Sequence, residues 1–163
     1  MRRAIFALCT VLFSASAFAA DTKDITLEAG GKPTLTAEVP KSAEVTTKKD
    51  KTTIAEKNVR IYIWPVASAK TVADAVPHAA EIIKSEFVKF DGKALDPLKL
   101  MGHEAKHLTG KGEEADDNDP GTADVVIFTD GKHVFAACVH GEGDEATKQR
   151  PELLKVLKSV KPQ

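Results

Sequence analysis

The sequence predicts an α+β fold in which a central antiparallel sheet is flanked by two main helices. Three observations lead to this prediction. Two apolar runs joined by a short turn occupy residues 122–140, a long helical pattern begins at Thr71, and a second helical pattern ends before Pro162. The segments follow one another in the order strands, helix, strands, helix, which is typical of α+β domains with an antiparallel sheet.

Residues 122–140 are expected to form a hairpin at the centre of the sheet. The runs 125–128 and 134–139 are apolar at every position. A strand with one solvent face would alternate apolar and polar residues, so both faces of this ribbon should be covered. The turn contains Asp130-Gly131, and Asp-Gly is a strong hairpin signal because glycine readily adopts the positive φ that such turns need.

The chain before Thr71 is expected to consist of short strands, at 25–27, 34–39, 45–49, 52–55 and 59–64. Lys48, Lys49 and Lys51 surround the tip of the third and fourth strands. This cluster could bind an acidic partner, although a threonine-rich hairpin with a charged tip is more often simply solvated.

Thr71 is expected to begin the longest helix. Thr71 and Asp74 resemble a capping box, and the acid also suits the positive end of the helix dipole. Pro77 should kink or divide this helix, and Gly92 marks its end. The apolar stripe recurs at steps of three and four through Val72, Val76, Ala79, Ile83, Phe87 and Phe90.

The second half of the chain is expected to add two short strands, at 98–101 and 103–108, before the central hairpin. Residues 110–121 are rich in glycine and carboxylates, which predicts a mobile surface loop. After the hairpin, Asp144 can cap a last helix, Pro151 suits a first-turn position after a break, and Pro162 stops the helix.

Residues 1–19 are expected to be a secretory signal peptide. A basic start is followed by an apolar stretch and by the small-residue site Ala17-Phe18-Ala19. The apolar stretch is shorter than the roughly 20 residues that span a bilayer, so no stable membrane insertion is expected. Residues 20–163 should then form a single domain that is periplasmic or extracellular.

Charge and cysteine content limit the function of the mature chain. Loss of Arg2 and Arg3 leaves 21 basic residues against 24 acidic ones, a formal charge of −3. With no long basic patch, nucleic acid and anionic membranes are poor candidate partners. Only Cys138 remains after processing, which excludes an intramolecular disulfide.

The stretch His103-Glu104-Ala105-Lys106-His107 fits the H-E-x-x-H pattern of zinc hydrolases. On a helix that spacing brings both imidazoles to one ion and lets the glutamate activate water. Here Gly102 precedes the stretch and Gly110 follows it closely, which argues against a helix. On a strand the histidines would lie about 13 Å apart, too far to share one zinc.

Two further groups could carry chemistry. The acidic stretch 113–119, with Asp124 just beyond, could supply oxygen ligands to a cation, but it does not fit an EF-hand loop. Its carboxylates are Glu113, Glu114, Asp116, Asp117 and Asp119. Cys138 and His140 are two residues apart and so share a strand face, and a thiolate beside an imidazole is the nucleophile arrangement of cysteine hydrolases. A cysteine within an apolar run is more often a core residue. We expect His78 and His133 to be ordinary surface residues.

The order of elements resembles the PsbP-like fold, which is shared by PsbP of photosystem II, the Ran-binding Mog proteins and periplasmic proteins such as DcrB. The resemblance rests on a strand ending at Pro65 before the long helix, the spacing of Gly102, Ala105, Leu108 and Gly110, and a hairpin leading to a final helix that ends Leu157-Lys158-Ser159-Val160. It implies a sheet flanked by helices, an α/β/α sandwich, and a binding role rather than catalysis. It implies no particular functional residue.

The sequence therefore predicts an exported, non-enzymatic accessory or binding domain whose partner is a protein or a small molecule. No catalytic residue, metal site or cofactor is expected. The alternatives are a metal-dependent hydrolase that uses residues 103–107 and a cation-binding module that uses the acidic stretch 113–119.

Overall fold

The computed structural model describes residues 21–95, 97–115 and 118–163, and the expected signal peptide lies outside them. The described chain is mostly antiparallel sheet with two helices, α1 (Val72–Glu86) and α2 (Glu145–Ser159). The main sheet contains, in spatial order, β3 (Glu44–Lys48), β4 (Lys51–Glu56), β5 (Val59–Pro65), β10 (Val134–Glu142), β9 (Pro120–Thr129), β8 (His103–Glu114) and β6 (Phe87–Ala94), while β7 (Leu98–Leu100) pairs with β8.

The central hairpin of the main sheet is the one that the sequence predicts. β9 and β10 pair antiparallel through nine residue pairs, from Val134 opposite Thr129 to Glu142 opposite Gly121. β5 and β8 extend the sheet on either side of this hairpin. Gly131 in the connecting turn has φ +92°, the positive value that favours glycine.

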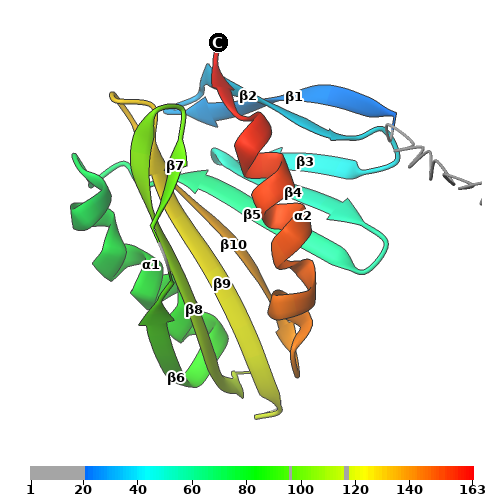
Figure 1. Cartoon of the computed structure of the whole chain (residues 1–163), viewed down its shortest axis with the longest axis vertical. Helices are drawn as coiled ribbons and strands as arrows, with labels where there is room; N and C mark the ends of the chain where they lie inside the picture. Colours follow the sequence, from blue (N-terminus) through cyan, green and yellow to red (C-terminus); the bar gives the residue numbers. More distant parts are fainter. Residues whose placement is uncertain (1–20, 96, 116–117) are drawn as a thin grey trace, which may run out of the picture.

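The two faces of β9 contribute to two different cores. Val126 and Phe128 pack in the core that contains residues of α2. Val125 and Ile127, which alternate with them, pack in the core that contains residues of α1. The helices therefore cover opposite faces of the central hairpin, and in Figure 1 α2 crosses beside β9 and β10 while α1 lies beside β6 and β8.

A second, three-stranded sheet lies at the end of the molecule where the chain finishes (Figure 1). It consists of β1 (Thr22–Ala29), β2 (Lys32–Pro40) and β11 (Lys161–Pro162). The sequence predicts strands near β1 and β2 but not their separation from the main sheet. Pro162, expected only to stop the last helix, lies in β11 and pairs with Leu35.

The long helix begins as predicted and ends earlier than predicted. Thr71 and Asp74 form the capping box, with the Asp74 carboxylate accepting from the Thr71 amide at 2.9 Å. The helix continues through Pro77 undivided and ends at Glu86. Phe87 already has extended backbone, with φ −130° and ψ 133°, and begins β6.

Glycines on β8 explain why the two phenylalanines leave the helix. The ring of Phe87 packs against Gly112 and the ring of Phe90 against Gly110, where a Cβ would overlap each ring. Antiparallel pairing of β6 with β8 places the rings there. Aromatic rings over backbone glycines are a favourable sheet contact, so tertiary pairing overrides the helical periodicity of this segment.

The prediction of a mobile surface loop at 110–121 is wrong for most of that range. β8 continues to Glu114 and β9 begins at Pro120. The amide of Glu114 donates to the carbonyl of Asp119 at 2.8 Å, which closes a tight connection. The glycines that suggested a loop are packing positions instead, since Gly121 also contacts the Phe87 ring. Within the described residues, neither helix is long and apolar enough to cross a membrane.

Replacing Gly112 with alanine should destabilise the fold, because its Cβ would overlap the Lys89 carbonyl oxygen as well as the Phe87 ring. We expect a loss of about 2 kcal/mol, as for other overpacked sites, measured by urea unfolding. Lys106→Ala, at an exposed position of the same strand, is the matched control and should change stability little. Equal unfolding midpoints for the two variants would contradict this packing.

Candidate functional site

One half of the main sheet has a face that neither helix covers. On β5, Ile61 and Ile63 point into the core on the α2 side. Tyr62 and Trp64 alternate with them and so point to the α1 side, where α1 packs against β9, β6, β10 and β8. Within the described residues, α1 does not pack in this way against β3, β4 or β5, so the opposite end of that face is open. Glu44 of β3 also lies on this face, because it pairs with Ala55, which pairs with Arg60. We call it the open face and define it by its basic and aromatic residues, which outnumber this one acid, namely Lys48, Lys51, Arg60, Tyr62 and Trp64.

The open face contains a small hollow of about 20 Å³ next to α1. The ammonium of Lys51 lies 4.6 Å from the centroid of the Tyr62 ring and 6.0 Å from that of Trp64. Both distances fall within the range of a cation–π contact. The rim of the hollow therefore combines a positive charge with two half-buried aromatic rings. The residues that line it are Lys51, Tyr62, Trp64, Ile83, Phe87, Ala123, Cys138 and His140.

Cys138 and His140 both lie in this hollow, on the same face of β10 as predicted. Cys138 is buried and packs in the α1 core, which confirms the expected core position. The ring of His140 stacks on Tyr62, with centroids 5.5 Å apart and an angle of 14° between the ring planes. Phe87 meets it edge-on at 6.4 Å. His140 is thus held as part of an aromatic stack.

The His103–His107 stretch lies on β8, so the predicted strand is confirmed and no zinc-binding helix is formed. His103 is exposed at the start of the strand, while His107 is buried four residues later. The Glu104 and Lys106 side chains are exposed. Among the described residues, no three His, Cys, Asp or Glu side chains come close enough to share a metal ion.

Among the described residues, the acidic stretch 113–119 contributes to no group of three side chains that could hold a metal ion. Glu113 forms an exposed ion pair with Lys89 at 3.1 Å, across from β8 to β6. Asp116 and Asp117, which the cation-binding alternative also uses, lie outside the described residues. Asp124, grouped with this stretch by the sequence, is instead a fully buried residue of β9.

Asp124 is the centre of a buried polar network that links β9 to α2. The guanidinium of Arg150 donates to both carboxylate oxygens of Asp124, from Nε and from Nη2, each at 3.0 Å. Nη2 also donates to Thr109 Oγ1 at 3.1 Å. His107 Nε2 approaches Asp124 Oδ1 at 3.4 Å, which is longer than a typical N–H···O bond. The pairing of Arg150 with Asp124 through two parallel hydrogen bonds is the geometry in which arginine binds carboxylates most strongly.

The network holds Asp124 in its charged form. Burial raises the pKa of the Asp124 carboxyl, but contacts with His107 and Arg150 favour the carboxylate and lower the pKa below its ordinary value of 3.8 overall. A carboxylate with no exposed surface would otherwise be strongly destabilising. The stability contributed by Asp124 therefore depends on Arg150 being in place.

A cavity of about 380 Å³ lies beside this network, between α2 and the edge formed by β6 and β8. The side chain of Arg150 is 27% exposed and forms part of its wall. The remaining lining residues are Asp91, Lys93, Leu95, Thr109, Gly110, Lys111, Thr122 and Thr147. Sequence reasoning missed this cavity because its residues come from four elements that are distant in the chain.

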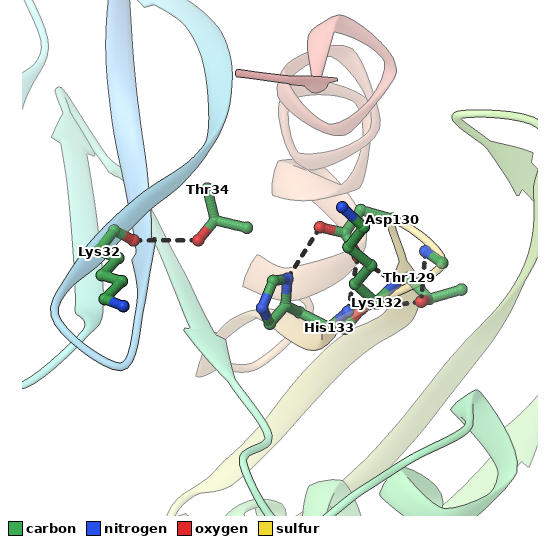
Figure 2. Close-up of polar contacts among 7 residues, drawn as sticks. Lys32, Thr34, Thr129, Asp130, Lys132 and His133 are labelled. Atoms are coloured by element: carbon green, nitrogen blue, oxygen red, sulfur yellow. Dashed lines mark hydrogen bonds and ion pairs between the residues drawn. The ribbon is translucent and has the colours of Figure 1, made fainter.

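Figure 2 shows the turn between β9 and β10, which faces the start of β2 across a second cavity of about 300 Å³. The Asp130 carboxylate accepts from the amides of Lys132 and His133 at 2.7 and 2.6 Å, and it contacts His133 Nδ1 at 3.0 Å. Burial raises the pKa of Asp130, and these contacts lower it overall. Asp130 and His133 therefore close their own turn, consistent with His133 as a surface residue. His78 likewise lies on the surface of α1, beside Ser68.

Known proteins resemble this chain in structure and not in sequence. No family model matches the chain, and no curated protein matches it. The solution structure of cyanobacterial PsbP (CyanoP) from Synechocystis superposes with a TM-score of 0.56 at 12% identity, covering 91% of this chain and 96% of CyanoP. The Ran-binding protein Mog1p of Saccharomyces cerevisiae also gives 0.56, at 10% identity, covering 88% of this chain and 96% of its own.

The chain has the PsbP-like fold. A third PsbP-like structure is LpqN of Mycobacterium tuberculosis, described as involved in cell envelope biogenesis, with a TM-score of 0.51 and 14% identity. The match covers 87% of this chain and 91% of LpqN. At such identities a PsbP-like match establishes the fold alone, so the function has to be argued from this chain's own residues.

Asp124→Asn should destabilise the protein at neutral pH, because it removes the charge that compensates Arg150. Breaking a fully buried pair costs about 3–5 kcal/mol, and we expect about 2 kcal/mol here because Arg150 keeps some contact with solvent. The lowered pKa means that this stabilisation is complete above the ordinary value of 3.8 and is lost as the pH falls through the folded-state pKa.

Urea unfolding of wild type and Asp124→Asn at pH 7, 5 and 3 measures this dependence. The difference between the two proteins should be constant from pH 7 to 5 and should shrink at pH 3. A difference that is the same at all three values would show that the charge of Asp124 does not stabilise the fold.

Proposed function

We propose that the protein is an exported, non-catalytic accessory domain that binds an acidic partner protein through the open face. Export follows from the expected signal peptide at residues 1–19, which would leave residues 20–163 as one domain. The α/β/α sandwich belongs to the same proposal and is supported by the two cores on opposite faces of β9.

The observation that carries the proposal is the charge and aromatic content of the open face. Lys48, Lys51 and Arg60 form no ion pair with any described residue. Half-buried aromatic rings beside such cations are typical of interface centres, where tyrosine, tryptophan and arginine are enriched. The positive charge favours a partner with an acidic surface.

Lys48 and Lys51, which the sequence allowed as either a binding site or a solvated hairpin tip, lie on the open face. Lys48 and Lys51 face each other across β3 and β4. Tyr62 pairs with Thr53 on the neighbouring strand, so the rings and the lysine ammonium groups share one face. A solvated hairpin tip would explain the lysines alone, but it would not explain the rings beside them.

Other members of the fold supply a precedent for protein binding without supplying residues. Mog1p is described as a Ran-binding protein.

The hydrolase alternative loses its main support because His103 and His107 lie on a strand, and two strand residues four apart are separated by about 13 Å.

Site-specific photocross-linking in cells that export the protein tests this function. A photoreactive residue at Arg60 should give one main protein adduct, in which this chain begins at Ala20 by mass. The same residue placed at Lys155, which is exposed on α2, should give little of that adduct. No adduct from Arg60, or equal adducts from both positions, would contradict the proposal.

The purified partner then allows a charge test on the same prediction. Lys51→Glu should weaken binding by about tenfold, because it reverses a charge at the interface. Lys155→Glu makes the same change in net charge on α2 and should leave the affinity unchanged. Equal affinities for wild type and Lys51→Glu would show that the partner does not bind at the open face.

A further inference from the structure

We infer that the cavity between α2 and the β6–β8 edge binds a small organic anion through a carboxylate or phosphate group. This cavity lies on the α2 side of the sheet, whereas the open face lies on the α1 side. The inference therefore does not depend on the proposed protein partner.

The charges around the cavity favour an anion. Lys93 of β6 and Lys111 of β8 line it together with Arg150 of α2, and Asp91 is the carboxylate among the lining residues. Asp124 pairs with Arg150 from behind, and Asp144 interacts electrostatically with Lys111, so the positive charge at the wall is partly compensated and still exceeds the negative charge of Asp91. Neither lysine forms an ion pair with a described residue. The chain as a whole carries a formal charge of −1, so this concentration of positive charge is local.

Arg150 is positioned in advance by the buried carboxylate behind it. Asp124 fixes the guanidinium through Nε and Nη2, each at 3.0 Å. Among the described residues, Nη1 has no hydrogen-bond partner, and the side chain is 27% exposed where it meets the cavity. An arginine held in one orientation loses little entropy when it binds an oxyanion, which raises the affinity.

The size of the cavity favours a small molecule over a polymer. Its volume of about 380 Å³ lies at the lower end of the range for small-ligand pockets. Thr147, which is exposed on α2, adds a hydroxyl group to the wall, which suits a polar ligand beyond its charged group. The Thr122 hydroxyl oxygen already accepts from the Ala146 amide at 3.1 Å. A bare phosphate would fill only part of this volume, so it serves as a probe of the charged end of the ligand.

Titration of ¹⁵N-labelled full chain with inorganic phosphate and with citrate tests this inference, with chloride at matched ionic strength as the reference. Both probes should cause saturable shifts at the amides of Gly110, Lys111 and Thr147. Saturation by phosphate alone identifies a phosphate ligand, and saturation by citrate alone identifies a carboxylate ligand. Shifts that never saturate, or that chloride reproduces, would overturn the inference.

Charge variants that leave the Asp124–Arg150 pair intact separate the cavity from a general salt effect. Replacing Lys93 and Lys111 together with alanine should weaken binding at least about tenfold, while Asp91→Asn should strengthen it. Replacing Lys99 and Lys106 together with alanine makes the same change in net charge and should change binding little, because both are exposed outside the cavity. Equal weakening by the two double variants would overturn the inference.

Discussion

The pairing of Asp124 with Arg150 is the interaction on which the arrangement of sheet and helix depends. Asp124 is the one charged residue among the buried positions of β9, and its side chain has no exposed surface. A buried carboxylate has to be compensated by a cation that also satisfies its hydrogen bonds. Arg150 of α2 lies over β9 and does this through both carboxylate oxygens. The same contact turns the rest of the guanidinium toward the cavity, so one ion pair affects both packing and surface chemistry.

Local signals in the sequence were sufficient to predict the central hairpin and the start of α1. Residues 125–128 and 134–139 are apolar throughout, and a helix on each side of the hairpin accounts for this. Thr71 and Asp74 satisfy each other within one helical turn, so the capping box needs no distant partner. The placement of the His103–His107 stretch on a strand was also predictable, because Gly102 and Gly110 both disfavour a helix around it.

Features that depend on distant contacts could not be predicted in this way. Phe87 and Phe90 fit the helical stripe as well as any residue, and only the glycines of β8, some 20 residues later, show why they form β6. In the sequence, Asp124 follows the acidic stretch 113–119 and looks like part of it. Its pairing with Arg150 becomes evident only in the folded chain. Of the candidate site residues, Cys138 and His140 were correctly placed on one face, but the rings of Tyr62 and Trp64 join them only through the pairing of β5 with β10.

A double-mutant cycle on Asp124 and Arg150 tests most directly whether the two side chains stabilise the fold as a pair. The cycle compares Asp124→Asn, Arg150→Met and the double variant by urea unfolding at pH 7. Each single variant leaves one charged partner uncompensated, so the double variant should lose less stability than the sum of the two, by at least about 1 kcal/mol. Losses that add to within about 0.5 kcal/mol would show that the two side chains act independently and would contradict the account.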